Sequence, residues 1–185
     1  IPASVPVILD GKFGDIANTA EHYARFAYDV VGADAVTVNP YMGDDAVRPF
    51  VRDSKLVFVL AKTSNKPQYS MQDMALTRGG NLADGVARVA GKLNTELGGG
   101  IGLVVGATHP TALAHIRSLS PNEWFLVPGV GAQGGDLAAT LRAGLRPDGS
   151  GLLINTSRVL WQAADAGAVA RELRKQINEL RPVTV

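Results

Sequence analysis

The stretch VILDGKFGD at residues 7–15 decides the fold class, because an uninterrupted apolar run leads directly into charged side chains. Similar short runs rich in Val, Ile and Leu recur along the chain and are bounded by turn residues. Continuous rather than alternating hydrophobicity is typical of strands buried on both faces, as in parallel sheets. We therefore expect six parallel strands, at residues 5–9, 35–38, 56–60, 101–105, 124–127 and 151–154.

Helical periodicity fills the segments between these strands. Apolar residues follow helical spacing from Tyr23, from Leu82 and from Val169. This alternation of strand and helix, with about thirty residues per unit, predicts the α/β class with a parallel sheet. Shorter helices are expected at residues 44–50, 110–118 and 136–143.

Two architectures are compatible with this alternation. A doubly wound open sheet would bind its ligand at a switch point of the strand order. An eight-stranded barrel would carry its chemistry on the loops that follow each strand. Six units fit the open sheet by count alone, whereas the polar motifs at the strand ends favour the barrel.

Composition narrows the function classes. The chain has 185 residues, which suits a single domain over residues 1–185. The net charge of +1 gives no basic surface for nucleic acid, and no apolar run is long enough to span a membrane. The first ten residues lack the pattern of a secretory signal. Cysteine is absent, which excludes disulfides and fits a reducing compartment, so we expect a cytoplasmic protein.

Asp10, Lys12 and Asp15 lie where the first strand is expected to end. In an extended strand, residues two apart point the same way, so Asp10 and Lys12 share one face. An ammonium flanked by carboxylates stays charged and keeps one orientation, which suits a proton donor to a developing carbanion. A structural ion pair is the alternative for any single Asp–Lys pair, but the D-x-K-x-x-D spacing favours a catalytic site.

Two later segments predict an anion site. PGVGAQGGD at residues 128–136 carries four glycines around Gln133, which would leave backbone N–H groups free to approach an anion. LLINTSRVL at residues 152–160 places Ser157 and Arg158 just past a strand. An arginine that faces such amides can bind phosphate through two parallel hydrogen bonds. The alternatives are a flexible turn and a surface arginine.

Other polar segments are less specific. AKTSN at residues 61–65 offers donors that could contact the polar edge of a ring, although Ser and Asn also favour turns. Asn39 follows another strand and is a candidate for substrate binding. Residues 63–80 form a long polar insertion that could act as a lid. The histidines have no partner at metal-ligand spacing: they are His22, His109 and His115.

Together these segments resemble the orotidine 5′-phosphate decarboxylase family. LDGKFGDIANT resembles the family signature D-x-K-x-x-D-I-x-x-T. Later strand ends match in the right order, as ADAVTVNPYMG, FVLAKTSN, GLVVGAT, FLVPGVGAQGGD and GLLINTSR. The resemblance covers essentially the whole chain and is strongest to the longer subgroup of some bacteria and of protozoan bifunctional enzymes. It implies a (β/α)8 TIM barrel that decarboxylates orotidine 5′-monophosphate to UMP, the last step of de novo pyrimidine synthesis.

The resemblance also implies a role for each motif residue. Asp10 would lie against the substrate carboxylate and destabilise it, and Lys12 would protonate C6 once carbon dioxide leaves. Asp15 and Thr19 would reach into the site of a neighbouring subunit, which implies a homodimer. No metal and no organic cofactor would be needed. The other implied contacts are Ser64 at the pyrimidine edge, Pro128 along the base pocket, and Gln133, Ser157 and Arg158 at the phosphate.

The chain departs from the family pattern in two respects. Gly11 and Phe13 stand where the longer subgroup would have Ala and Arg, and Gly11 could loosen the strand. The family also has two strands ahead of the Asp-x-Lys strand, which carry a further substrate-binding Asp and a Lys that pairs with the first carboxylate. Since a TIM barrel typically has about 250 residues, we expect roughly 65 residues and the first two strands to be missing from this chain. A fused orotate phosphoribosyltransferase beyond Val185 is also compatible with the resemblance.

Two alternative functions stay open. A sister activity uses similar D-x-K-x-x-D residues for the magnesium-dependent decarboxylation of a keto-sugar phosphate. A binding module or disabled fragment would hold a UMP-like phosphate ligand without catalysis, and the missing strands are its support. The T-S-N and G-A-Q-G-G segments favour the pyrimidine substrate.

Overall fold

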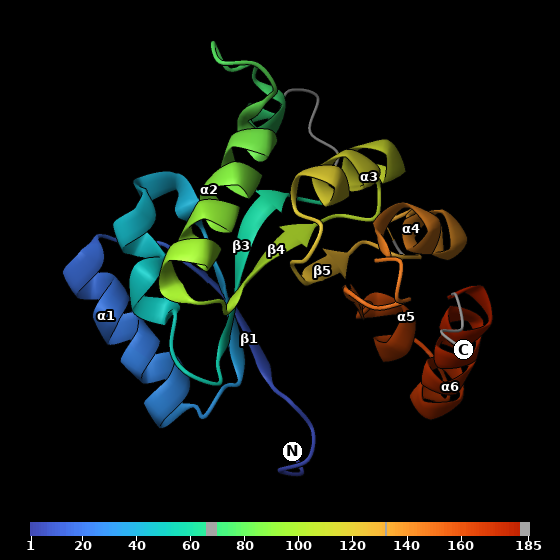
Figure 1. The fold of residues 1–185 in the computed structure, drawn as a ribbon. Helices are drawn as coiled ribbons and strands as arrows, with labels where there is room; N and C mark the ends of the chain where they lie inside the picture. The colour runs from blue at the N-terminus through green and yellow to red at the C-terminus, as the bar shows by residue number, and fades with distance from the viewer. Residues whose placement is uncertain (66–69, 132, 182–185) are drawn as a thin grey trace.

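The computed structural model describes residues 1–65, 70–131 and 133–181, and it contains one parallel sheet (Figure 1). The strand order follows the chain from β1 to β6 without a reversal. A doubly wound sheet requires a reversal, so this order identifies the curled sheet as a half-barrel and confirms the barrel type. The strands are β1 (Ile8–Phe13), β2 (Ala35–Val38), β3 (Leu56–Lys62), β4 (Ile101–Val105), β5 (Phe125–Pro128) and β6 (Leu152–Asn155).

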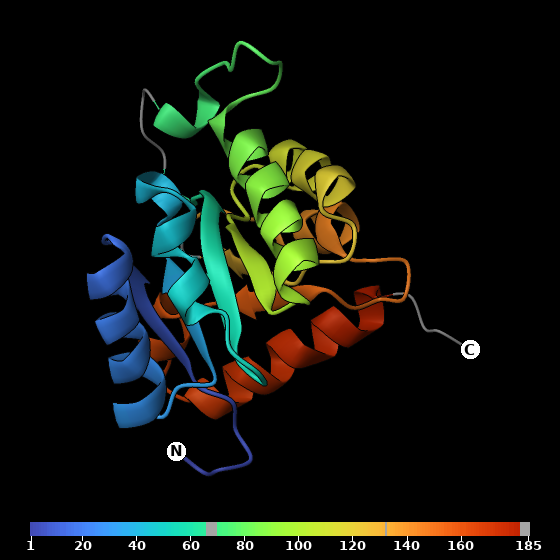
Figure 2. The same cartoon turned by 60° about the vertical axis from the view of Figure 1, so that its left-hand side comes forward.

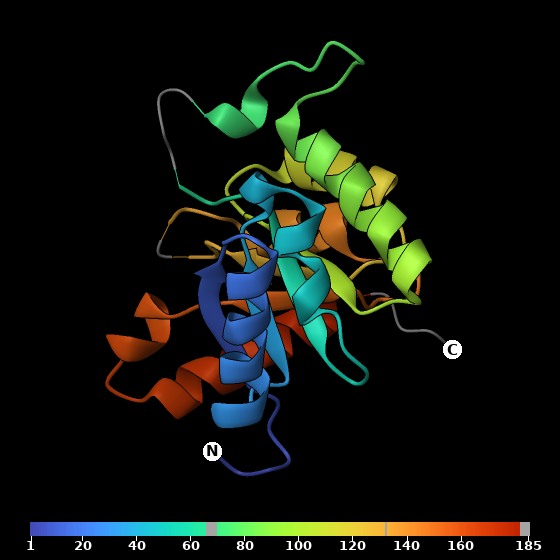
Figure 3. The same ribbon diagram turned by 90° about the vertical axis from the view of Figure 1, so that its left-hand side faces the viewer.

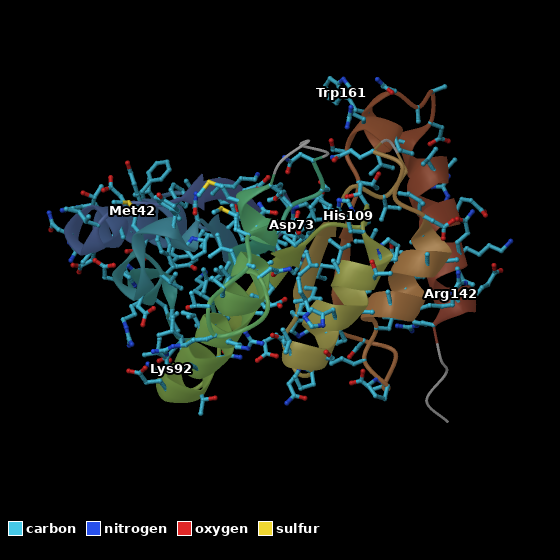
Figure 4. The ribbon with its side chains drawn as sticks, turned by 90° about the horizontal axis from the view of Figure 1, so that it is seen from above. Met42, Asp73, Lys92, His109, Arg142 and Trp161 are labelled. Atoms are coloured by element: carbon cyan, nitrogen blue, oxygen red, sulfur yellow. The ribbon has the colours of Figure 1, made fainter. Side chains whose placement is uncertain are left out.

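The helices cover the outer face of this sheet in an arc, as the view from above shows (Figure 4). Two further views show α2 packed across β3 and β4 (Figures 2 and 3). Asn81 and Asp84 form a capping box at the start of α2, and Asp136 and Asp165 cap the helices that follow them. The α-helices are α1 (Ala17–Arg25), α2 (Leu82–Leu97), α3 (Pro110–Leu119), α4 (Leu137–Gly144), α5 (Arg158–Trp161) and α6 (Ala166–Leu180).

The strands are apolar on both faces because each face contributes to a different core. The outer core fills the space between sheet and helices and includes Val57 and Val59 of β3. The inner core lies inside the half-barrel and includes Phe58, with Leu60 packed against it. This arrangement explains the continuous apolar runs. None of the helices in the described part of the chain is long and apolar enough to cross a membrane.

Three expectations about the elements need correction. The first strand begins three residues later than the predicted 5–9 and contains Asp10 and Lys12 of the charged motif. The expected helix at 44–50 is two 3-10 turns, Asp44–Ala46 and Arg48–Phe50, since Pro49 lacks the N–H that a continuous helix needs. The helix around Tyr23 exists, but most of the apolar stripe that predicted it is exposed: Tyr23, Phe26, Val30 and Val31 face solvent, and only Ala27 of the stripe is buried. The buried residues of this helix are Ala20, Ala24, Ala27 and Tyr28, the last two in the π-helix Phe26–Val30 that continues α1.

The polar insertion after β3 is described at 63–65 and 70–80. It contains one 3-10 turn, Met71–Asp73, which is capped by the Ser70 side chain. Residues 66–69 of the expected lid lie outside the described residues. The remaining 3-10 turn, Pro40–Met42, follows β2.

Candidate active site at the carboxyl ends of the strands

A cavity of about 380 Å³ lies where the carboxyl ends of the strands converge. Its apolar residues, Leu60, Val104 and Leu126, belong to the inner core. Its other residues come from strand ends and the loops after them, where a barrel protein carries its site. These are Asp10, Lys12, Thr37, Thr63, Ser64, Asn65, Pro128, Gln133 and Asn155.

Asp10, Lys12 and Thr37 form one hydrogen-bonded network. The Lys12 ammonium donates to both Asp10 oxygens at 2.8 and 2.7 Å, and the Thr37 hydroxyl donates to Asp10 Oδ1 at 2.7 Å. Partial burial raises the pKa of Asp10, but the hydrogen bonds from Lys12 and Thr37 outweigh it, and the pKa lies below its usual value. The cavity therefore presents an ionised carboxylate and an ammonium held side by side.

The backbone of β1 is irregular at this network, which corrects the regular extended strand that we expected. Pairing with β2 shifts register between Leu9 and Phe13, and Lys12 has a φ of 46°. A left-handed conformation costs a non-glycine residue roughly 1–2 kcal/mol. The Lys12 N–H donates to Thr37 Oγ1 at 2.9 Å and helps to hold this conformation. Asp10 and Lys12 still point into the same cavity, as the spacing predicted.

Packing explains why position 11 is glycine, which the sequence alone did not reveal. A Cβ at Gly11 would lie 2.5 Å from Cε2 of Phe13, far inside van der Waals contact. The Phe13 ring is packed against Tyr23 and Phe50, with ring centroids 5.3 and 5.6 Å away. The two departures from the family pattern are therefore coupled, since the ring at 13 occupies the space that a methyl group at 11 would need.

We expect Gly11→Ala to destabilise the protein by about 1–3 kcal/mol, the usual cost of overpacking. Urea denaturation would measure this loss. In a Phe13→Leu background the same substitution should cost less. Gly91→Ala is the matched control, because its Cβ would meet nothing closer than 4.0 Å and alanine favours a helix. An unchanged unfolding free energy for Gly11→Ala would show that the ring does not hold this position.

Ser64 lines the cavity and lies in close contact with two glycines. Its exposed fraction is 8%. A Cβ at Gly106 or at Gly129 would lie 2.7 Å from atoms of Ser64, so only glycine permits this approach. The Thr108 hydroxyl donates to the Ser64 carbonyl at 3.2 Å. The segments that follow β3, β4 and β5 therefore pack together around Ser64 and set the position of this residue.

The glycine-rich loop after β5 differs from its prediction in one respect. The N–H groups of Gly131, Gly134 and Gly135 donate to carbonyl oxygens within the loop, at 2.7–3.0 Å, so they are not free for an anion. Gln133 lines the cavity as predicted. A Cβ at Gly131 would lie 3.1 Å from Val159, so the loop adjoins the segment that carries Ser157 and Arg158. Ala132 lies outside the described residues.

Five of the ten predicted site residues line the cavity: Asp10, Lys12, Ser64, Pro128 and Gln133. Asn39 instead accepts the Tyr41 N–H at 3.0 Å, caps the turn Pro40–Met42 and lines a neighbouring cavity. Asp15 accepts the Ile16 N–H at 2.8 Å, and Thr19 lies half-buried on α1. Ser157 and Arg158 are exposed at the start of α5.

The predicted set omitted four polar residues that line the cavity. Thr37 interrupts an apolar strand run, and Asn155 ends one, which is the signal that could have found them. Thr63 and Asn65 flank Ser64 in the AKTSN segment. Because Thr37 bonds both Asp10 and the Lys12 backbone, it is the most informative of the four.

The strands of this chain follow barrel order, and a polar cavity lies at their carboxyl ends. These two features place the chain in the class of α/β-barrel proteins that bind a small ligand at that face. The model of the orotidine 5′-phosphate decarboxylase / HUMPS family matches residues 2–173, and the chain belongs to this family.

Among curated proteins, the orotidine 5′-phosphate decarboxylase of Roseiflexus sp. (strain RS-1) is 49% identical over 181 residues, which are 94% of this chain and 66% of that protein. Among solved structures, Leishmania donovani UMP synthase has 52% identity and a TM-score of 0.92, over 98% of this chain and 40% of that chain. A putative orotidine-monophosphate decarboxylase from Toxoplasma gondii has 44% identity and a TM-score of 0.94. The match covers 97% of this chain and 68% of that chain. The chain spans about two thirds of the length of the curated relatives it matches.

Proposed function

We propose that this chain carries the catalytic residues of an orotidine 5′-phosphate decarboxylase, which converts orotidine 5′-monophosphate to UMP and carbon dioxide. The observation that carries the proposal is the ionised Asp10 beside the Lys12 ammonium, at a cavity of about 380 Å³. The relatives named above support the choice of reaction.

In the proposed mechanism, Asp10 acts on the ground state and Lys12 on the product of bond cleavage. Two carboxylates about 4 Å apart repel each other by roughly 4 kcal/mol at an effective dielectric constant of 20. This repulsion disappears as the bond between C6 and the carboxylate breaks and carbon dioxide leaves. The electron pair stays on C6 and takes a proton from Lys12, whose amine is then reprotonated from water. Such interactions accelerate the reaction because they favour the transition state over the bound substrate.

Substrate binding is assigned to the remaining strand ends. Ser64 would contact the pyrimidine edge and Pro128 would line the base, since both face the cavity. Gln133, Ser157 and Arg158 would hold the phosphate. Contact between the segments that carry them supports this grouping. Asn39 serves in this proposal as the cap of its turn.

We further propose a homodimer in which Asp15 and Thr19 reach the neighbouring site. Neither residue lines the cavity of its own chain, and the residues that flank α1 include exposed apolar side chains, with Ile16 56% and Phe26 48% exposed. Sedimentation velocity would measure the assembly. The fused orotate phosphoribosyltransferase and the cytoplasmic location stay predictions.

The first experiment follows the loss of orotidylate absorbance when the chain is added, with and without EDTA. Turnover that EDTA leaves unchanged would support the decarboxylase. Chelator-sensitive turnover of a keto-sugar phosphate would favour the magnesium-dependent sister activity. Binding of UMP without turnover would favour the binding module.

A further inference from the structure

Lys62, the last residue of β3, is a buried cation that the proposed mechanism does not use. It is 6% exposed, and its ammonium donates to Asp73 Oδ1 at 2.6 Å. Strict alternation from Phe58 and Leu60 would point Lys62 into the half-barrel. The pairing with β4 shifts register between Leu60 and Lys62, and such a bulge re-aims the side chain that follows it. Lys62 therefore faces a separate cavity of about 260 Å³, lined otherwise by the 70–84 segment, α2 and α3.

The charges in this outer cavity identify Asp73 as the partner of Lys62. The other carboxylate of this cavity, Asp84, is buried, accepts the Asn81 N–H at 3.0 Å and lies 3.1 Å from His115 Nε2. The hydrogen bond from Lys62 lowers the pKa of Asp73, and nearby His109 adds to this effect. Figure 4 shows Asp73 and His109 near the centre of the view from above. The ion pair thus joins the end of β3 to the turn Met71–Asp73.

The same turn is bonded to the wall of the proposed active site. Gln72 accepts the Thr63 N–H at 3.0 Å, and its Nε2 donates to the Thr63 hydroxyl at 2.9 Å. Thr63 and its neighbours Ser64 and Asn65 line the catalytic cavity. Lys62 therefore bonds to Asp73 on the side of the outer cavity, and Thr63 bonds to Gln72 on the side of the catalytic cavity.

We propose that Lys62 is a positioning residue for base recognition. Its ion pair with Asp73 holds the turn Met71–Asp73 on β3, and the turn fixes the donors of Thr63, Ser64 and Asn65 toward the pyrimidine. This inference rests on the proposed function for the identity of the ligand. The contacts of Lys62 with Asp73 and of Thr63 with Gln72 do not depend on which ligand binds.

Calorimetric binding of UMP and of ribose 5-phosphate, which lacks the base, tests the proposal. For Lys62→Met we expect UMP affinity to fall at least tenfold and ribose 5-phosphate affinity to change less than twofold. Lys62→Arg, which keeps the charge, should recover part of the loss. Lys175→Met is the matched control, because it breaks an exposed ion pair with Glu179 on α6. Equal losses for both ligands would overturn the positioning role.

Amide hydrogen exchange of residues 61–65 in the free protein separates this inference from the proposed function. Exchange there should accelerate in Lys62→Met and not in Lys175→Met, and unchanged exchange would overturn the inference whatever the chain binds. If the wild-type chain binds neither ligand, the proposed function fails and the exchange result alone decides. Asp73→Asn, at a largely exposed side chain, gives the same test should Lys62→Met not fold.

Discussion

Replacing Lys12 by Ala will lower decarboxylation of orotidine 5′-monophosphate by a factor of at least about 10³–10⁴, the upper range for loss of a general acid. The substitution removes the ammonium that lies 2.7 Å from Asp10 and would protonate C6. Alanine keeps a side chain at this left-handed position, so the backbone demand stays the same. UMP affinity should change less than tenfold, because the other cavity residues remain. Initial rates of absorbance loss and calorimetric binding of UMP measure the two effects.

Two variants control this experiment. Lys12→Arg should not restore turnover, since the pKa of a guanidinium lies well above that of an ammonium and the group gives up its proton poorly. Lys92→Ala removes an exposed ammonium on α2, away from the cavity, and should leave turnover unchanged (Figure 4). Full activity in Lys12→Ala would refute the assignment of the proton donor.

The strands and the central charged pair could be predicted from the sequence because each depends on local pattern, whereas local pattern left two strand orders open and the barrel was favoured by the polar motifs and by the family resemblance. Continuous apolar runs require burial on both faces, and this structure buries them between two cores. The side-chain period of a strand placed Asp10 and Lys12 together even though β1 is irregular there. These features need no knowledge of distant contacts.

The features that prediction missed depend on contacts between distant segments. The coupling of Gly11 to Phe13 exists only because Tyr23 and Phe50 hold the ring in place. The outward turn of Lys62 comes from a register shift against β4, which no local pattern encodes. The glycine N–H groups after β5 were expected to be free, but those of Gly131, Gly134 and Gly135 donate hydrogen bonds within the loop. Composition gives a loop its conformational freedom, whereas tertiary packing decides how that freedom is used.

The largest expected effect on stability is at Arg117, at the opposite end of the sheet from the cavity. Its guanidinium donates to the carbonyl oxygens of Ser120, Glu123, Gly144 and Gly151 at 2.8–3.0 Å and lies 3.6 Å from the centroid of the Phe125 ring. Burial lowers the pKa of Arg117 to about 10, which shows how far the group is removed from water. One side chain thereby joins the end of α3, the end of α4 and the starts of β5 and β6.

We expect Arg117→Met to lower the free energy of unfolding by about 3–5 kcal/mol, because the lost hydrogen bonds leave carbonyl oxygens without a donor. The melting temperature should fall by roughly 6–20 °C, at about 2–4 °C per kcal/mol for a chain of this size. Urea denaturation followed by circular dichroism measures the change.

Two arginine variants make the result specific. Arg117→Lys keeps a charge, but a single ammonium cannot reach four carbonyl oxygens in separate directions, so its stability should lie between those of wild type and Arg117→Met. Arg142→Met changes an exposed residue in the last turn of α4 and should shift stability by no more than about 0.5 kcal/mol (Figure 4). A loss below about 1 kcal/mol in Arg117→Met would mean that water replaces the guanidinium at these carbonyls. The hydrogen bonds would then define the geometry of this end of the sheet without stabilising it.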